Sequence, residues 1–149
     1  MYAINHNKLQ RDATDKEYFC CFDLIDNEHS VIMLDDHAIF KVLKDDCILK
    51  KKNIQARPLI EGLLKMPNGY KRARLSNILK NIRTNGIMLT VNSLVYKDIE
   101  VYFDNGKLKY FNDKEFNDLS WWINRDVNLP IYVKQGREII AVISNVFKR

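Results

Sequence analysis

The pattern of apolar and polar positions predicts strands at both ends of the chain and helices in the middle. Near the N-terminus, residues suited to a pleated sheet predict strands at Tyr18–Ile25, Ser30–Leu34 and Ala38–Leu43, with Cys47–Lys51 as a weaker candidate. Aspartate and asparagine between these segments favour turns, because their side chains bond to nearby backbone groups. We therefore expect an antiparallel meander. Residues 1–16 are polar and lack periodicity, which indicates a loosely ordered lead-in.

The middle of the chain has helical spacing. Pro58 suits the first turn of a helix, since the N–H that proline lacks would be unpaired there. The residues after it are apolar nearly all round, so this short helix is expected to be buried. A longer amphipathic helix is predicted from Tyr70 to Thr84, ended by Asn85-Gly86 in a left-handed conformation. Its apolar stripe has the spacing i, i+3, i+4, i+7: Leu75, Ile78, Leu79 and Ile82.

The next segment predicts a hairpin and a third helix. Residues 99–111 alternate around Asn105-Gly106, a dipeptide typical of two-residue hairpin turns. Residues 113–124 are expected to be helical, because Asn112 and Glu115 occupy the positions of a capping box.

The C-terminal segment predicts a second hairpin, formed by residues 129–133 and 138–146. Ile139–Ile143 is unbroken apolar sequence, which is typical of a strand covered on both faces. The whole chain, residues 1–149, is therefore expected to form one domain of the α+β class. We expect a mainly antiparallel sheet, made of the N-terminal meander and the C-terminal hairpins, with about three helices packed on it.

Composition narrows the class of protein. The chain is 46% hydrophobic and 29% charged, which is ordinary for a globular protein. No apolar run is long enough for a membrane span, and no signal-peptide pattern opens the chain. Three cysteines make a poor disulfide framework, so a reducing, cytoplasmic setting is expected. The chain has many Lys, Asn and Ile residues and few Ala residues, a bias typical of AT-rich genomes, including those of phages.

Positive charge is concentrated in the central third. Residues 41–83 hold twelve Lys and Arg against three acids, whereas residues 1–40 carry a net charge of −5 and residues 84–149 a net charge of +1. Such a block attracts polyanions or acidic protein surfaces. The candidate binding residues are Lys50, Lys51, Lys52, Arg57, Lys71, Arg72, Arg74, Lys80 and Arg83.

The expected pair of central helices, joined by a turn at Gly69, has the outline of a helix-turn-helix, whose second helix would place Arg72 and Arg74 in a major groove. Two alternatives stay open. One is contact with phosphates or single strands, for which a sheet face with Tyr and Lys could supply stacking. The other is an ordinary helical hairpin with solvated basic residues.

The Trp121-Trp122 pair is a further candidate for contact with a binding partner. On the expected helix, Trp122 lies on the buried stripe and Trp121 lies away from it. An exposed Trp121 would be an interface anchor, and its burial against another element is the alternative.

The acidic N-terminal third could hold a divalent metal for a nuclease, although its carboxylates also suit turns and match no metal-binding spacing. We therefore assign no metal site, no cofactor and no catalytic residues, and no enzyme motif is found. The leading hypothesis is a non-enzymatic cytoplasmic protein that binds DNA, RNA or a nucleic-acid-processing complex through the basic patch, in a regulatory or interfering role. The alternatives are a protein–protein inhibitor or adaptor that binds an acidic host-protein surface and, third, a metal-dependent nuclease.

Overall fold

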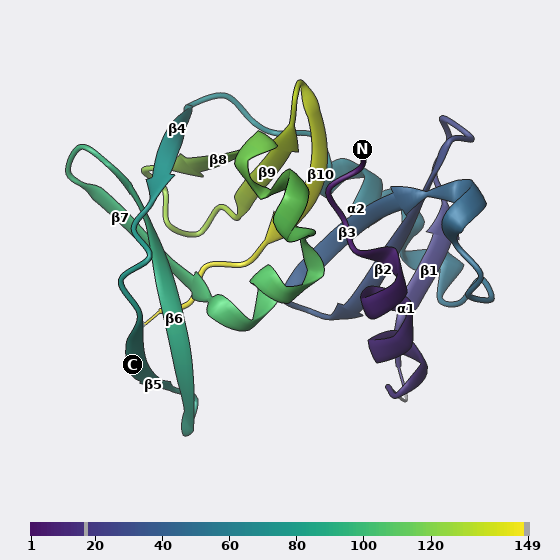
Figure 1. Ribbon diagram of the computed structural model, residues 1–149, viewed down its shortest axis with the longest axis horizontal. Helices are drawn as coiled ribbons and strands as arrows, with labels where there is room; N and C mark the ends of the chain where they lie inside the picture. The colour runs from purple at the N-terminus through teal and green to yellow at the C-terminus, as the bar shows by residue number, and fades with distance from the viewer. Residues whose placement is uncertain (17, 148–149) are drawn as a thin grey trace.

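The computed structural model describes residues 1–16 and 18–147. In this part of the chain, ten antiparallel strands form one twisted sheet with the order β1-β2-β3-β10-β9-β8-β4-β6-β5, and β7 also pairs with β6 (Figure 1). The strands are β1 (Cys20–Asp23), β2 (His29–Asp35), β3 (Ala38–Leu43), β4 (Tyr70–Leu75), β5 (Lys80–Thr84), β6 (Ile87–Tyr96), β7 (Ile99–Asp104), β8 (Leu119–Asn124), β9 (Ile131–Gln135) and β10 (Glu138–Ile143). The helices are α1 (His6–Thr14) and α2 (Arg57–Leu63), with the short 3₁₀ helices η1 (Lys44–Asp46), η2 (Ile54–Ala56), η3 (Asn105–Tyr110) and η4 (Asp113–Asp118). The prediction of a mainly antiparallel sheet with short helices is confirmed, but the number and positions of the helices differ.

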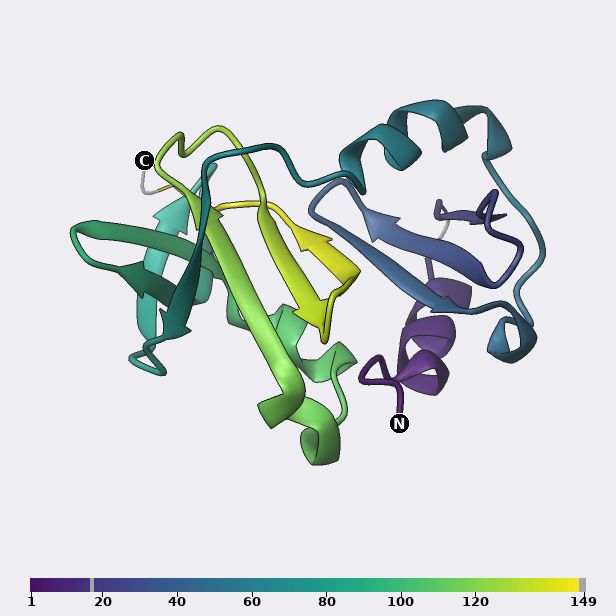
Figure 2. The same cartoon turned by 90° about the horizontal axis from the view of Figure 1, so that it is seen from above.

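Both faces of the central strands are covered. Helix α2 lies on one face, where Ile60 packs in a cluster with Tyr70, Tyr132 and Val142. Helix α1 lies on the opposite face (Figure 2). There a larger core gathers side chains from α1, η3 and the strands, and it includes Phe103 and Trp121. Strand β10 contributes to both clusters, which confirms that Ile139–Ile143 is covered on both faces.

The N-terminal meander forms as predicted, and β1, β2 and β3 pair in sequence order. Two expectations for this region are wrong. Residues 1–16 are not a loose lead-in, because α1 is capped by the Asn5 side chain and buries Leu9 and Ala13. The weaker candidate, Cys47–Lys51, is not a strand. The chain there is irregular, and its backbone pairs with β1 through a bridge between Cys21 and Lys52.

The predicted helix from Tyr70 to Thr84 is wrong, because this segment forms strands β4 and β5. Strand β4 pairs with β8 along its first part and with β6 at its end, so its backbone groups are satisfied in the sheet. Ile78 and Leu79, expected on a buried stripe, lie exposed between the two strands. Helix α2 starts with proline in its first turn as predicted, but it is not buried all round, since Leu59 is 71% exposed.

Neither Asn-Gly dipeptide has its expected role. Asn85 and Gly86 both have positive φ and form the two-residue turn of the β5–β6 hairpin, in which Thr84 pairs with Ile87. Asn105-Gly106 opens η3 after β7, and the Asp104 carboxylate caps this helix by accepting from the Gly106 N–H. The predicted hairpin over residues 99–111 is therefore wrong. Strand β7 pairs instead with β6.

The predicted helix at residues 113–124 is also wrong. Residues 113–118 form η4, and Leu119–Asn124 is strand β8. Successive side chains of a strand point to opposite faces, so Trp121 enters the main core, the reverse of the expectation, and Trp122 lies on the other face, where it is partly buried against the smaller cluster. Trp121 stacks on Phe103 with 5.6 Å between ring centroids. The second C-terminal hairpin forms as predicted, from β9 and β10.

Candidate nucleic-acid interface

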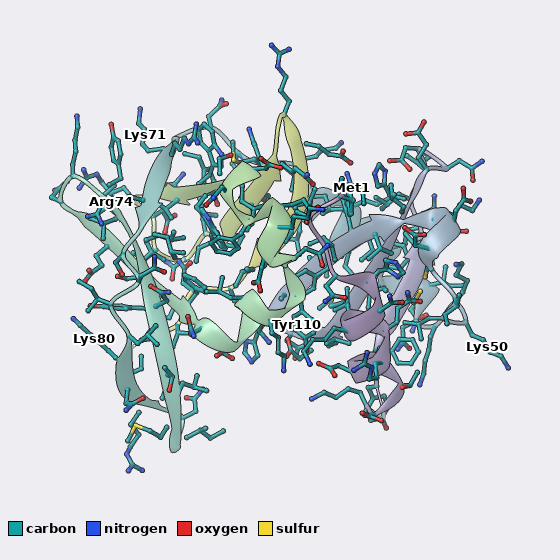
Figure 3. All side chains as sticks on the ribbon, in the orientation of Figure 1. Met1, Lys50, Lys71, Arg74, Lys80 and Tyr110 are labelled. Atoms are coloured by element: carbon teal, nitrogen blue, oxygen red, sulfur yellow. The ribbon has the colours of Figure 1, made fainter. Side chains whose placement is uncertain are left out.

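The candidate basic residues do not converge on one patch. Figure 3 shows Lys50 at one end of the long axis of the molecule and Lys71, Arg74 and Lys80 at the other. The sequence from 41 to 83 passes from β3 to β4 and β5, which lie in opposite halves of the sheet. The expectation of a single central patch is therefore wrong.

Near β1 and α2, three of the candidate basic residues interact with neighbouring side chains of the protein. Lys51 forms an ion pair with Asp23 at 2.9 Å, and Arg57 pairs with Glu61, one helical turn away, at 3.0 Å. The ammonium of Lys52 lies 4.8 Å from the centroid of a phenylalanine ring. Lys50 is exposed.

A cationic sheet face forms at the other end, from Arg72 and Arg74 on β4, Trp122 on β8 and Lys134 on β9. Arg72 lies directly opposite Trp122 in the β4–β8 pair, and such partners point to the same face of a sheet. Arg74, two residues along β4, points the same way. The Lys134 ammonium lies 4.5 Å from the centroid of the Trp122 ring. Neither arginine has an ion-pair or side-chain hydrogen-bond partner among residues 1–16 and 18–147.

Helix α2 covers one part of the same sheet face. Tyr70 and Tyr132 belong to the same face and are buried beneath α2, and the Tyr132 hydroxyl donates to the Leu63 carbonyl at the end of the helix. Beyond this contact, Arg72 is exposed and Trp122 is partly exposed. This part of the face therefore presents cations beside an aromatic ring.

The same sheet face continues onto β6, β7 and β5. Arg74 is paired with Val95, and Val95 is paired with Glu100 on the next strand. The Tyr102 hydroxyl donates to Glu100 and accepts from the Lys80 ammonium at 3.2 Å. The hydrogen bond to Tyr102 raises the pKa of Lys80, so this ammonium remains charged. Lys80 also lies 5.4 Å from the Tyr102 ring centroid, which gives the face a second aromatic–cation pair.

Besides Lys50, Lys51, Lys52 and Arg57, three more predicted binding residues are not part of this surface. Lys71 and Arg83 are exposed, but they alternate with Arg72 and Lys80 along their strands and therefore point to the opposite face. Trp121 is only 5% exposed and cannot be a surface anchor. Sequence reasoning missed Trp122 and Lys134. The alternation of apolar residues from Leu119 to Asn124 was the signal that could have identified Trp122.

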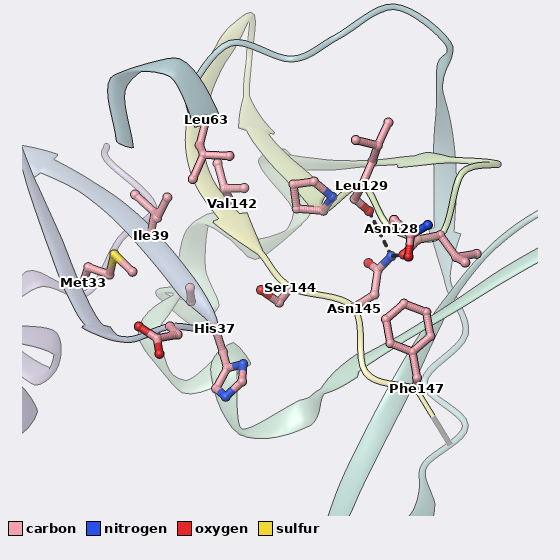
Figure 4. Close-up of a pocket in the computed structure, with 14 residues that line it drawn as sticks. Met33, His37, Ile39, Leu63, Asn128, Leu129, Val142, Ser144, Asn145 and Phe147 are labelled. Carbon is pink, nitrogen blue, oxygen red and sulfur yellow. Dashed lines mark hydrogen bonds between the residues drawn. The ribbon is translucent and has the colours of Figure 1, made fainter. Parts of the chain in front are cut away.

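A separate cleft lies between the two halves of the molecule (Figure 4). It has a volume of about 380 Å³ and is lined by residues from the β2–β3 region, α2, and the segments before β9 and after β10. The Asn145 amide donates to the backbone carbonyls of Val127 and Leu129. Its Oδ1 is buried and is the only such side-chain atom without a partner in the described part of the chain. The cleft wall combines apolar side chains with the polar side chains of Asp36, His37 and Ser144.

Several carboxylates of the acidic N-terminal third have structural partners. Asp26 accepts from the Glu28 and His29 N–H groups and from the His29 ring, and Asp35 pairs with Lys107 at 2.8 Å. Over the described residues, no group of three or more His, Cys, Asp or Glu side chains could hold a metal ion.

Within residues 1–16 and 18–147, no helix has the length and apolar character needed to cross a bilayer. Comparison with protein-family models, with curated proteins and with solved structures finds no match to this chain.

Proposed function

We propose that the protein binds single-stranded nucleic acid through the cationic sheet face. The observation that carries the proposal is the arrangement of Arg72, Trp122 and Lys134 on three adjacent strands, with the aromatic ring between the two cations. Proteins that bind single strands combine a positively charged surface for the phosphates with aromatic rings on which bases stack. This arrangement has both parts.

Each side chain has a distinct role in the proposed complex. Arg72 and Arg74 lie on the same side of β4, about 7 Å apart by strand geometry, which is close to the spacing of successive phosphates in an extended strand. Lys134 lies over the Trp122 ring in the free protein. An incoming base would take its place, since base stacking contributes about 1–3 kcal/mol and an exposed cation–π contact about 0.5–1 kcal/mol. The displaced ammonium would then reach a neighbouring phosphate.

The proposal is tested by the binding of fluorescein-labelled single-stranded and duplex oligonucleotides to the full chain. Arg72→Gln combined with Arg74→Gln should abolish most of the affinity for the single strand. The matched control is Arg11→Gln with Lys50→Gln, which removes the same charge from exposed sites at the N-terminal end and should leave binding unchanged. Equal loss in both double variants would show that only net charge matters, and the proposed site would then be wrong.

A second candidate function is binding to an acidic protein surface. It is favoured by four large apolar side chains exposed around the β5–β6 hairpin, beyond the cationic sheet face: Ile78, Leu79, Ile87 and Met88. Exposed apolar groups of this kind contribute to protein interfaces. A pull-down from cell extract with and without nuclease treatment separates the two functions. A protein captured equally after nuclease treatment, together with no affinity for oligonucleotides, would favour this second function.

A further inference from the structure

Two thiols from distant parts of the chain meet at the end of the molecule opposite the cationic sheet face. Cys21 lies on β1, and Cys47 lies in the irregular segment after η1. Their sulfur atoms are 3.6 Å apart, and all three cysteines are free. Cys21 is fully buried and Cys47 is partly exposed. A solvent-reachable thiol therefore lies in contact with a shielded one.

The backbone around each thiol is held in place. The Gln10 side chain of α1 donates to the Asp46 carbonyl at 2.9 Å and accepts from the Ile48 N–H at 2.7 Å, so it fixes the chain on both sides of Cys47. Gln10 is itself buried. Cys21 exchanges two backbone hydrogen bonds with Lys52, at 3.0 and 2.9 Å. The short sulfur–sulfur distance therefore results from two anchored segments.

The surroundings favour a thiolate on Cys47. The hydrogen bond with Cys21 lowers the pKa of Cys47, and the nearby Lys51 ammonium lowers it further. The same hydrogen bond, together with burial, raises the pKa of Cys21. Lys51 is held at this place by its ion pair with Asp23. A thiolate that is stabilised by a neighbouring cation and partly exposed is the reactive form of cysteine.

Cys20 provides an internal comparison. It precedes Cys21 on β1 and so points to the opposite face of the sheet, where it packs against the cluster beneath α2. Burial raises the pKa of its thiol. It is partly exposed like Cys47, but it has neither a thiol partner nor a stabilised thiolate.

We propose that Cys21 and Cys47 form a peroxide-reactive dithiol site, in which Cys47 is the attacking thiol and Cys21 is the resolving thiol. The Cys47 thiolate attacks one oxygen of hydrogen peroxide and breaks the O–O bond. This step gives a Cys47 sulfenic acid and a hydroxide ion, which takes up the proton that Cys47 had released and becomes water. The Cys21 sulfur then attacks the Cys47 sulfur and displaces hydroxide, which leaves as water with the Cys21 proton. In sum, two thiols and one peroxide give one disulfide and two waters.

The test is oxidation of the reduced full-length protein by hydrogen peroxide, followed by mass spectrometry of intact and digested protein. The expected product is a monomer that has lost two hydrogen atoms, with Cys21 and Cys47 joined in one cross-linked peptide pair and dithiothreitol reversing the change. Cys47→Ser should slow thiol loss about tenfold or more, because the remaining thiols are mostly protonated at neutral pH. Cys20→Ser should react like the wild type.

A trapping experiment checks the order of attack. Cys21→Ala should stop the reaction at the Cys47 sulfenic acid, which dimedone labels. Circular dichroism must show that this variant is folded. Should it unfold, competition between dimedone and disulfide formation in the wild-type protein supplies the same information. Oxidation that occurs first at Cys20, a disulfide between two chains, or loss of the reaction in Cys20→Ser would each overturn the proposal.

Discussion

The salt dependence of binding gives the sharpest test of the cationic sheet face. Four cations on this side of the sheet are placed to contact phosphates: Arg72, Arg74, Lys80 and Lys134. Each phosphate contact on a single strand contributes roughly −0.7 to the slope of log K against log salt, so four contacts predict a slope of about −2.8. Raising salt from about 50 mM to about 200 mM should then weaken binding roughly 50-fold.

The double variant Arg72→Gln/Arg74→Gln removes two of these contacts. Its slope should fall to about −1.4, and the same change in salt should weaken its binding only about sevenfold. Fluorescence anisotropy of a labelled oligonucleotide across this salt range measures both slopes. The Arg11→Gln/Lys50→Gln control should keep the steeper slope. A double variant at Arg72 and Arg74 that binds more weakly with an unchanged slope would refute the reasoning, because its arginines would then not contact phosphates.

Three further predictions concern stability and are measured by urea denaturation. Trp121→Ala should cost about 3–5 kcal/mol, as for other large core side chains, whereas Trp122→Ala should cost much less because Trp122 is partly exposed. Gly86→Ala should destabilise the protein by about 1–2 kcal/mol because Gly86 has φ +78°, whereas Gly62→Ala, in a helix with open space around it, should stabilise it by about 0.5–1 kcal/mol. Burial opposes ionisation of Asp35, but a lysine hydrogen bond and a backbone N–H outweigh it and lower its pKa. This carboxylate therefore stabilises the fold above its unfolded pKa of about 4 and loses that contribution as pH falls through its folded pKa, so Asp35→Asn should reduce the loss of stability on acidification.

The meander and the last hairpin were predictable because their signals are local and unambiguous. The roles of the two Asn-Gly dipeptides were not predictable. Asn-Gly can supply positive φ to a hairpin turn or to a helix end, but Asn105 and Gly106 do not have positive φ and begin η3. Residues outside the dipeptide determine which structure each Asn-Gly adopts. Thr84 and Ile87 find partners across the β5–β6 hairpin, whereas Asp104 caps the turn at Gly106 and directs the chain into η3.

The segment from Tyr70 to Thr84 shows how the two periodicities can compete. Its four apolar residues fit a helix, but Tyr70–Leu75 also alternates, with Ala73 and Leu75 packed on the main core. The first part of this segment forms a strand rather than a helix because it pairs with β8 and β6, which come later in the sequence. The spacing of apolar residues within one segment cannot predict this pairing, because the partner strands come from other parts of the chain.

The candidate site was predictable only in part, for a related reason. A run of charges in the sequence becomes a surface patch only if its residues fold onto one face. Arg72 and Arg74 were predicted, but their neighbours in space, Trp122 and Lys134, come from about fifty or more residues further along the chain. Antiparallel pairing, rather than sequence proximity, assembles the cationic sheet face.

The two proposed sites lie at opposite ends of the sheet, and this separation leads to a last prediction. A Cys21–Cys47 disulfide would close a loop of residues 26 apart in sequence, which by chain entropy should stabilise the protein by roughly 3.5 kcal/mol. The strands of the cationic sheet face are already paired in the reduced protein, so oxidation should raise the urea midpoint while leaving oligonucleotide affinity and its salt slope unchanged. The measurement is denaturation and anisotropy on the same oxidised sample, with Cys47→Ser as the control that peroxide should not stabilise. A change in salt slope on oxidation of the wild type alone would contradict this independence, because it would require the dithiol end to alter the positions of Arg72 and Arg74.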